Sequence, residues 1–114
     1  MHEASIATYI LNAIVKYSKN RKVKLVKLEV GEFVVLNIEQ LLFVLNALKR
    51  SISNLKNAKF EVELVEGIVK CSECGYEGKS LKDSHIALPI CPKCYEKAEI
   101  LRGNELKIRE ITLS

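Results

Sequence analysis

The chain has 114 residues, enough for one ordinary domain with a small insertion. Hydrophobic residues make up 48% of it and charged residues 28%, a balance that excludes wholesale disorder. The formal charge of +4 is too small to indicate a nucleic-acid-binding protein, and no apolar run approaches the ~20 residues that a membrane span needs. Because no signal peptide is recognisable, we expect a cytoplasmic protein, whose four cysteines are then metal ligands or redox groups rather than disulfide partners.

The first predicted element is an amphipathic helix over residues 5–17. Its apolar residues recur at helical spacing and predict one buried stripe: Ile6, Ile10, Ala13, Ile14 and Tyr17. Four basic residues follow near the helix end: Lys16, Lys19, Arg21 and Lys22. We interpret them as cations that suit a helix C-terminus, in preference to the alternative of a binding patch.

The second predicted helix begins at Asn37, an N-cap residue with Gln40 placed to complete a capping box. Strands are predicted over residues 22–33, loosened from Gly31 on, and over residues 59–65 and 104–113. In the first strand the alternation slips near Leu25 and Val26, so either a bulge lies there or the strand begins later. In the second strand the inward residues are Phe60, Val62 and Leu64, and in the third they are Leu106 and Ile108.

This order predicts an α+β fold: a three-stranded mixed sheet with two helices on one face, plus an inserted zinc-ribbon module. The α/β module covers residues 1–66 and 104–114, and residues 67–103 form the insertion. The insertion is rich in cysteine, glycine, lysine and proline, and it has few large apolar residues. A segment of this size needs a metal or a disulfide to fold.

The insertion carries two Cys-x-x-Cys pairs, Cys71–Cys74 and Cys91–Cys94, sixteen residues apart. This spacing is typical of a two-knuckle zinc site, and four protein ligands leave no position for a substrate, which indicates a structural ion. Gly75 follows the first pair, where a positive φ is often needed. Tyr95 takes the same place in the second, so that knuckle must bear strain or turn differently.

Two other interpretations of the insertion stay open. Cys-Pro-Lys-Cys resembles redox motifs, which would make the chain a thiol oxidoreductase. His85, between the pairs, could replace a cysteine ligand or respond to pH, although a lone loop histidine is more often solvated. No nucleophile–base constellation is present for a hydrolase, and we do not expect an enzyme.

Zinc ribbons often bind nucleic acid, so this alternative function needs a test of charge. The insertion has a net charge of +1, which four thiolates and Zn²⁺ would change to −1. Its only aromatic residues are Tyr76 and Tyr95. Phosphate binding requires clustered positive charge and, for single strands, stacking aromatics, so this insertion is poorly suited to nucleic acid.

The chain starts with Met1-His2-Glu3, which offers three nitrogens in sequence: the Met1 amine, the His2 backbone nitrogen and His2 Nδ1. With the amide deprotonated, they form most of a square-planar site, which favours Ni(II) or Cu(II). A fourth donor could be the backbone nitrogen or carboxylate of Glu3. Alternatively, His2 is a chance residue and Glu3 merely favours the positive end of a helix.

The MHEASIA start and the cysteine quartet, together with LEVGEF, NIEQLLF and GNELKIREI, resemble the HypA/HybF family of hydrogenase nickel-incorporation proteins over the whole chain. The resemblance implies a nickel metallochaperone that binds nickel through His2, with Met1 contributing, and holds a structural zinc. It implies delivery to the hydrogenase large subunit with help from a partner GTPase. From the apolar runs and the charge of the insertion we expect no membrane or nucleic-acid partner. Glu39 matches the position of a family carboxylate near nickel, but it is glutamate here, not aspartate.

Overall fold

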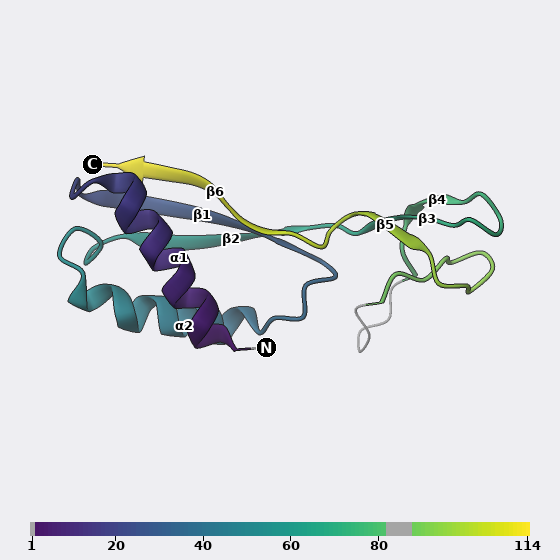
Figure 1. Cartoon of the computed structure of the whole chain (residues 1–114), viewed down its shortest axis with the longest axis horizontal. Coiled ribbons are helices and arrows are strands. Elements are labelled where there is room, and N and C mark those ends of the chain that lie inside the picture. Colours follow the sequence, from purple (N-terminus) through teal and green to yellow (C-terminus); the bar gives the residue numbers. More distant parts are fainter. Residues whose placement is uncertain (1, 82–87) are drawn as a thin grey trace. The chain divides into compact units, whose positions relative to one another are not determined.

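The computed structural model describes residues 2–81 and 88–114, and it divides into two compact units (Figure 1). The first unit comprises Met1–Leu28, Leu36–Glu63 and Ile108–Ser114. The second comprises Glu29–Val35 and Leu64–Lys107. Each unit therefore contains segments that are distant in the sequence. The chain passes from one unit to the other within its three long strands and once more between Val35 and Leu36, in a loop.

Both predicted helices are present in the first unit. Helix α1 spans Glu3–Ser18, and helix α2 spans Ile38–Leu48 and continues into a short 3₁₀ helix, η1, at Lys49–Ser51. Asn37 is the N-cap of α2, as predicted, and its side chain accepts a hydrogen bond of 3.0 Å from the backbone N–H of Gln40. Within the described residues, no helix combines the length and apolarity needed to cross a membrane.

A three-stranded sheet has the order β2-β1-β6, with β1 at Val23–Gly31, β2 at Lys59–Val65 and β6 at Leu106–Leu113. The backbone bonds from Ser114 N–H to Lys22 and from Gly31 N–H to Glu105 make β6 antiparallel to β1. Figure 1 shows β1 and β2 running in the same direction and β6 in the opposite one. The predicted mixed sheet is confirmed.

The first unit has one hydrophobic core to which both helices and all three strands contribute. Its buried residues are Ala7, Ile10, Leu11, Ile14, Val23, Val26, Leu28, Leu41, Leu45, Leu55 and Ala58. Because α1 and α2 share this core, they cover the same face of the sheet, as predicted. In β1, Val23 and Val26 are both buried and Leu25 is half-buried, so the alternation breaks where the sequence indicated and the strand does not begin later.

Two apolar residues were placed wrongly by the sequence. Tyr17 is 63% exposed, because the buried stripe of α1 is rotated toward Leu11 and Ser18. Buried Ser18 is satisfied there: its hydroxyl donates to the Val15 carbonyl and accepts from the Asn54 amide. Leu64 is 67% exposed, because β2 continues past the core of the first unit, and Leu64 belongs to the second.

The second unit contains a small antiparallel sheet that the sequence did not predict. Its strands are β3 at Ile68–Lys70, β4 at Glu77–Lys79 and β5 at Glu99–Arg102, in the order β4-β3-β5. Val69, in the central strand, pairs with Gly78 on one side and Ile100 on the other. Strands of three or four residues are too short to give a period-2 pattern, so sequence reasoning had no signal for them.

Three glycines of the second unit meet where no side chain fits. A Cβ on Gly31 would lie 2.1 Å from the carbonyl oxygen of Gly103, and a Cβ on Gly103 would lie 2.7 Å from the Cα of Gly67. A Cβ on Gly67 would meet the Phe33 ring at 2.4 Å. We call this close approach of three backbones the glycine crossing. Gly103 also has a φ of 107°, which L side chains rarely adopt.

Candidate metal centres

The four cysteines come together in the second unit. The Sγ atoms of Cys71, Cys74, Cys91 and Cys94 all lie within 4.8 Å of one another. The shortest contacts join the two pairs: Cys71 Sγ is 3.5 Å from Cys94 Sγ, and Cys74 Sγ is 3.5 Å from Cys91 Sγ. Tetrahedral zinc with Zn–S bonds of 2.3 Å would separate its sulfurs by about 3.8 Å. The donor set and its spacing therefore fit one Zn²⁺.

The two Cys-x-x-Cys turns have the same backbone geometry. In the first, the N–H of Cys71 bonds to the Tyr76 carbonyl and the N–H of Gly75 bonds back to the Cys71 carbonyl. The second turn repeats this pattern: the N–H of Cys91 bonds to the Glu96 carbonyl, and the N–H of Tyr95 bonds back to the Cys91 carbonyl. Gly75 has a φ of 78° and Tyr95 a φ of 63°. The second turn therefore bears the predicted strain, since a tyrosine occupies the left-handed region.

The thiols of the cluster shift one another's pKa values in opposite directions. Burial raises the pKa of Cys91, but N–H groups of Cys94 and Lys93 and the neighbouring thiols outweigh it and lower this pKa to about 7. At Cys94 the N–H of Glu96 lowers the pKa, yet the Cys71 and Cys91 sulfurs and burial raise it to about 12. Adjacent thiolates repel one another, so a dication among the four sulfurs would favour the ionised form of all of them.

The core of the second unit depends on the same cysteines. Its buried residues are Val69, Cys71, Cys91 and Ala98, packed with half-buried Phe33, Tyr76 and Cys94. Two of the four buried members are thus cysteines of the cluster. Such a core is small for folding a segment by hydrophobic burial alone, which favours an additional link through the four sulfurs.

The amino-terminal site residues lie at the start of α1. His2 is the N-cap of α1 and is exposed; its carbonyl accepts from the N–H of Ile6, while its imidazole makes no capping hydrogen bond. The histidine side chain therefore has no structural role in the helix. Met1 and His85, both named by the sequence analysis, lie outside the described residues.

Glu3 connects the starts of the two helices. Its Oε2 accepts a hydrogen bond of 3.1 Å from the backbone N–H of Asn37. This bond and the N–H of Glu3 itself lower the pKa of the Glu3 carboxyl below its ordinary value. The predicted capping box is therefore only half right, because Glu3 rather than the Gln40 side chain accepts from Asn37. A charged carboxylate is the stronger acceptor, and a contact over 34 residues leaves no sequence signal.

Glu39 is exposed in the first turn of α2, two residues after Asn37. Since Asn37 touches Glu3, the carboxylates of Glu3 and Glu39 belong to the same end of the first unit as His2. That end offers an imidazole and two carboxylates. Such a donor set can hold a transition-metal ion.

Comparison with known proteins gives one consistent answer. Residues 1–113 match the family model described as "Hydrogenase/urease nickel incorporation, metallochaperone, hypA". The hydrogenase maturation factor HypA of Methanopyrus kandleri is 37% identical over 92% of this chain and 87% of its own length. The hydrogenase maturation factor HypA of Methanocaldococcus jannaschii is 34% identical over 99% of this chain and 97% of its own length.

Solved structures agree in fold. The solution structure of the Ni metallochaperone HypA from Helicobacter pylori has a TM-score of 0.69 at 19% identity, and the match covers 99% of this chain and 97% of that one. A further solution structure of a HypA protein has a TM-score of 0.67. The family model, the curated relatives and the fold all agree, and the chain belongs to the HypA family of hydrogenase and urease nickel-incorporation proteins.

Proposed function

We propose that the chain binds Ni(II) at its amino terminus and delivers it during maturation of a [NiFe] hydrogenase. Membership of the HypA family supports hydrogenase nickel incorporation in general. The observation that carries the site is His2: an exposed metal-binding side chain at the tip of α1 that the helix does not use.

The proposed ligands are the Met1 amine, the His2 backbone nitrogen and His2 Nδ1. The first N–H groups of a helix have no intrahelical partner, so deprotonating the amides at this tip breaks no bond of the helical ladder. Glu3 is the proposed fourth donor, through its backbone nitrogen or through Oε1, since Oε2 is held by Asn37. Glu39 is proposed as an outer carboxylate at the same end. Protons must leave these donors for nickel to bind, so acid should release the metal.

The four cysteines are proposed to hold a structural Zn²⁺. Their sulfurs lie at the spacing of a tetrahedral site, and they supply half of the buried core of the second unit. When bound, zinc would neutralise the thiolates and fix the two turns. No ligand position remains for substrate, so this centre suits a folding role.

A ligand set at the chain tip suits transfer of a metal. An acceptor site can approach it from outside and replace its ligands one at a time. The proposed partners are the nickel-insertion GTPase of the hydrogenase maturation system and the hydrogenase large subunit. Neither role requires chemistry on a substrate by this chain.

The test is nickel and zinc stoichiometry on the untagged protein, on His2→Ala and on a form with residues added before Met1. Both changes are expected to abolish specific nickel binding and leave zinc intact. His85→Ala, the only other histidine substitution available, is the matched control and is expected to keep nickel. Undiminished nickel binding in the extended form would refute the amino-terminal site.

The zinc assignment is tested separately with Cys74→Ala. This variant is expected to lose zinc and the order of the second unit, while the helical signal of the first unit persists. Ser72→Ala, in the same turn, removes a hydroxyl but no thiolate and is the control. Zinc retained at full stoichiometry in Cys74→Ala would show that the four sulfurs do not form the site.

A further inference from the structure

Two loops of the first unit carry an unusual concentration of positive charge. Residues 16–24 contain five basic side chains and residues 49–59 contain four, and neither segment contains an acidic residue. All of these side chains are exposed except Lys49, which is half-buried and donates to the Ala58 carbonyl. We call the surface formed by these two segments the basic face.

The loops are tied into one surface. The backbone N–H of Val23 donates to the Asn54 carbonyl, and the Asn54 amide donates to Ser18 Oγ at 2.8 Å and to the Arg21 carbonyl at 2.9 Å. The two groups of cations are therefore held together by the fold, although about thirty residues separate them. Holding like charges together costs free energy, which only a structural or functional requirement offsets.

Structural requirements account for only part of the basic face. A helix C-terminus favours cations, and this explains Lys16 and Lys19 at the end of α1, and Lys49 and Arg50 in η1 at the end of α2. Lys22, Lys24, Lys56 and Lys59 lie in loops or strands. Among the residues that the structure describes, no exposed cation of the basic face forms an ion pair, whereas Lys27 and Arg109, elsewhere in this unit, do.

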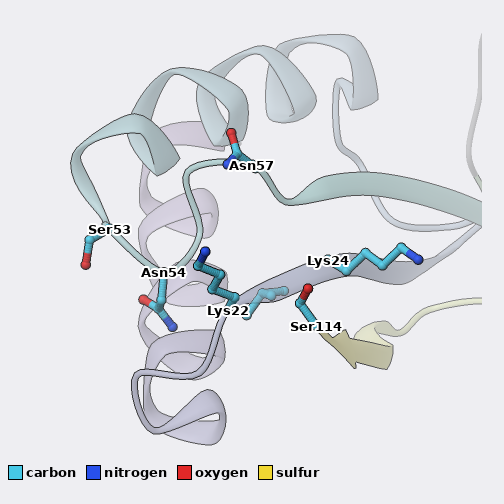
Figure 2. A pocket seen from close by; sticks show the side chains of 7 residues that line it. Lys22, Lys24, Ser53, Asn54, Asn57 and Ser114 are labelled. Carbon is cyan, nitrogen blue, oxygen red and sulfur yellow. The ribbon is translucent and has the colours of Figure 1, made fainter.

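A pocket of about 250 Å³ lies within the basic face. It is lined by Lys22, Val23, Lys24, Ser53, Asn54, Asn57 and Ser114. Figure 2 shows the Lys22 side chain reaching toward the loop that carries Asn54 and Asn57, while Lys24 extends along β1. The pocket thus offers the Lys22 ammonium group beside the loop of Asn54 and Asn57, with Lys24 lining it along β1, and ammonium and amide N–H groups are donors suited to a carboxylate.

We propose that the basic face docks an acidic segment of a partner protein, with a carboxylate side chain in this pocket. The proposal rests on the proposed function, because a protein that hands over nickel must meet its acceptor and then leave. Unpaired exposed charges raise the association rate more than they lengthen the lifetime of a complex. A lysine-rich face with no apolar centre is therefore suited to a brief, steered encounter.

Protein fits this face better than nucleic acid does. The pocket has no aromatic lining on which a base could stack, and Tyr17, the exposed aromatic nearby, lines a different hollow with Ala13 and residues 108–111. A pocket of this volume admits a carboxylate side chain but not a duplex.

The basic face is separate from the proposed nickel end. Helix α1 has 16 residues, so about 24 Å of helix separates His2 from Lys19. The acidic residues at the helix starts, Glu3 and Glu39, belong to the opposite end from the basic face. A partner docked on the basic face therefore leaves the amino-terminal tip uncovered, and this arrangement permits metal transfer within a complex.

The test compares Lys22→Glu/Lys56→Glu with Lys97→Glu/Arg102→Glu, which makes the same charge change at exposed positions of the second unit. The probe is a short poly-glutamate peptide, titrated into zinc-loaded protein at low salt. We expect the first pair to weaken binding by about tenfold or more and the second pair to change it far less. Backbone shift changes should map to residues 16–24 and 49–59 in the unmodified protein. Lys22→Gln/Lys56→Gln provides a milder variant if charge reversal unfolds the chain.

Equal weakening by both pairs would overturn the proposal, because it would show a response to net charge only. Tighter binding of an RNA strand or of phosphatidylserine vesicles than of poly-glutamate at the same salt would overturn it too. Nickel stoichiometry on the same variants keeps the two proposals apart. If the basic-face variants lose peptide binding but keep nickel, the result tests the basic face alone. If His2→Ala loses nickel but still binds the peptide, the result tests the amino-terminal site alone.

Discussion

The glycine crossing gives the sharpest prediction, because three single substitutions separate backbone strain from steric overlap. Gly75→Ala adds a Cβ at a φ of 78° with nothing within 4 Å, so it introduces strain only. Gly31→Ala places a Cβ 2.1 Å from a backbone oxygen, so it introduces overlap. Gly103→Ala does both, at a φ of 107° and 2.7 Å from the Gly67 Cα.

The expected losses in free energy of unfolding follow from these contacts. For Gly75→Ala, a left-handed penalty of about 1–2 kcal/mol is partly offset by the lower entropy of the unfolded chain, which leaves about 1 kcal/mol. For Gly31→Ala, overlap with a backbone that cannot rotate away costs about 3 kcal/mol, the upper end for overpacking. Gly103→Ala combines the two and should cost about 4 kcal/mol.

The assay is urea unfolding of the zinc-loaded protein, followed by zinc release to a colorimetric chelator and by the methyl signals of Val69 in the second core. Equal slopes with urea among the variants would show that only stability has changed. The expected order of loss is Gly103→Ala, then Gly31→Ala, then Gly75→Ala. A Gly103→Ala variant as stable as Gly75→Ala would refute the close approach of the three backbones.

Three further predictions concern single contacts. Asn37→Ala should cost about 1 kcal/mol by urea unfolding followed by circular dichroism, because it removes the cap on Gln40, whereas Asn46→Ala, at an exposed position inside α2, should cost less than half as much. Because the pKa of Glu3 is lowered in the folded protein, its stabilising contribution is present above pH 4.5 and is lost as the pH falls through the pKa of the folded state. The free energies of unfolding of the wild type and Glu3→Gln, measured against pH, should therefore converge in acid. A difference between them that does not change with pH would contradict this. Tyr95→Asn should raise the free energy of unfolding, measured by zinc release in urea, by about 0.5–1 kcal/mol, because asparagine tolerates a positive φ, while Tyr95→Ala should give no such gain.

Sequence reasoning located the features that have a local or periodic signal. Helical spacing gave both helices, β2 was placed at residues 59–65 with the bounds that the structure has, and the N-cap at Asn37 was found. The cysteine spacing predicted the cluster, because a chelating pair needs a fixed short separation and a second pair completes a tetrahedron.

The remaining features depend on contacts between distant segments. The Glu3–Asn37 bond, the glycine crossing and the tie from Asn54 to Arg21 each join residues more than thirty positions apart. The short strands β3, β4 and β5 follow from the cysteine turns rather than from their own composition. Tyr17 shows the limit of periodicity. Helical spacing predicts that α1 has an apolar face, but it does not fix which neighbouring residues lie at the edge of that face, because adjacent turns offer several apolar residues.

The hydrogen bond from Asn37 to Glu3 has a consequence for how the amino terminus can vary. Each residue added within a helix turns what precedes it by about 100° and moves it about 1.5 Å along the axis. One residue inserted after Glu3 would therefore swing its carboxylate away from Asn37 and point His2 in another direction. A substitution at Ala4 or Ser5, both exposed, leaves that geometry unchanged. The number of residues between Glu3 and the body of α1 is thus fixed by this contact. At this end of the chain, substitutions should be tolerated much more readily than insertions or deletions.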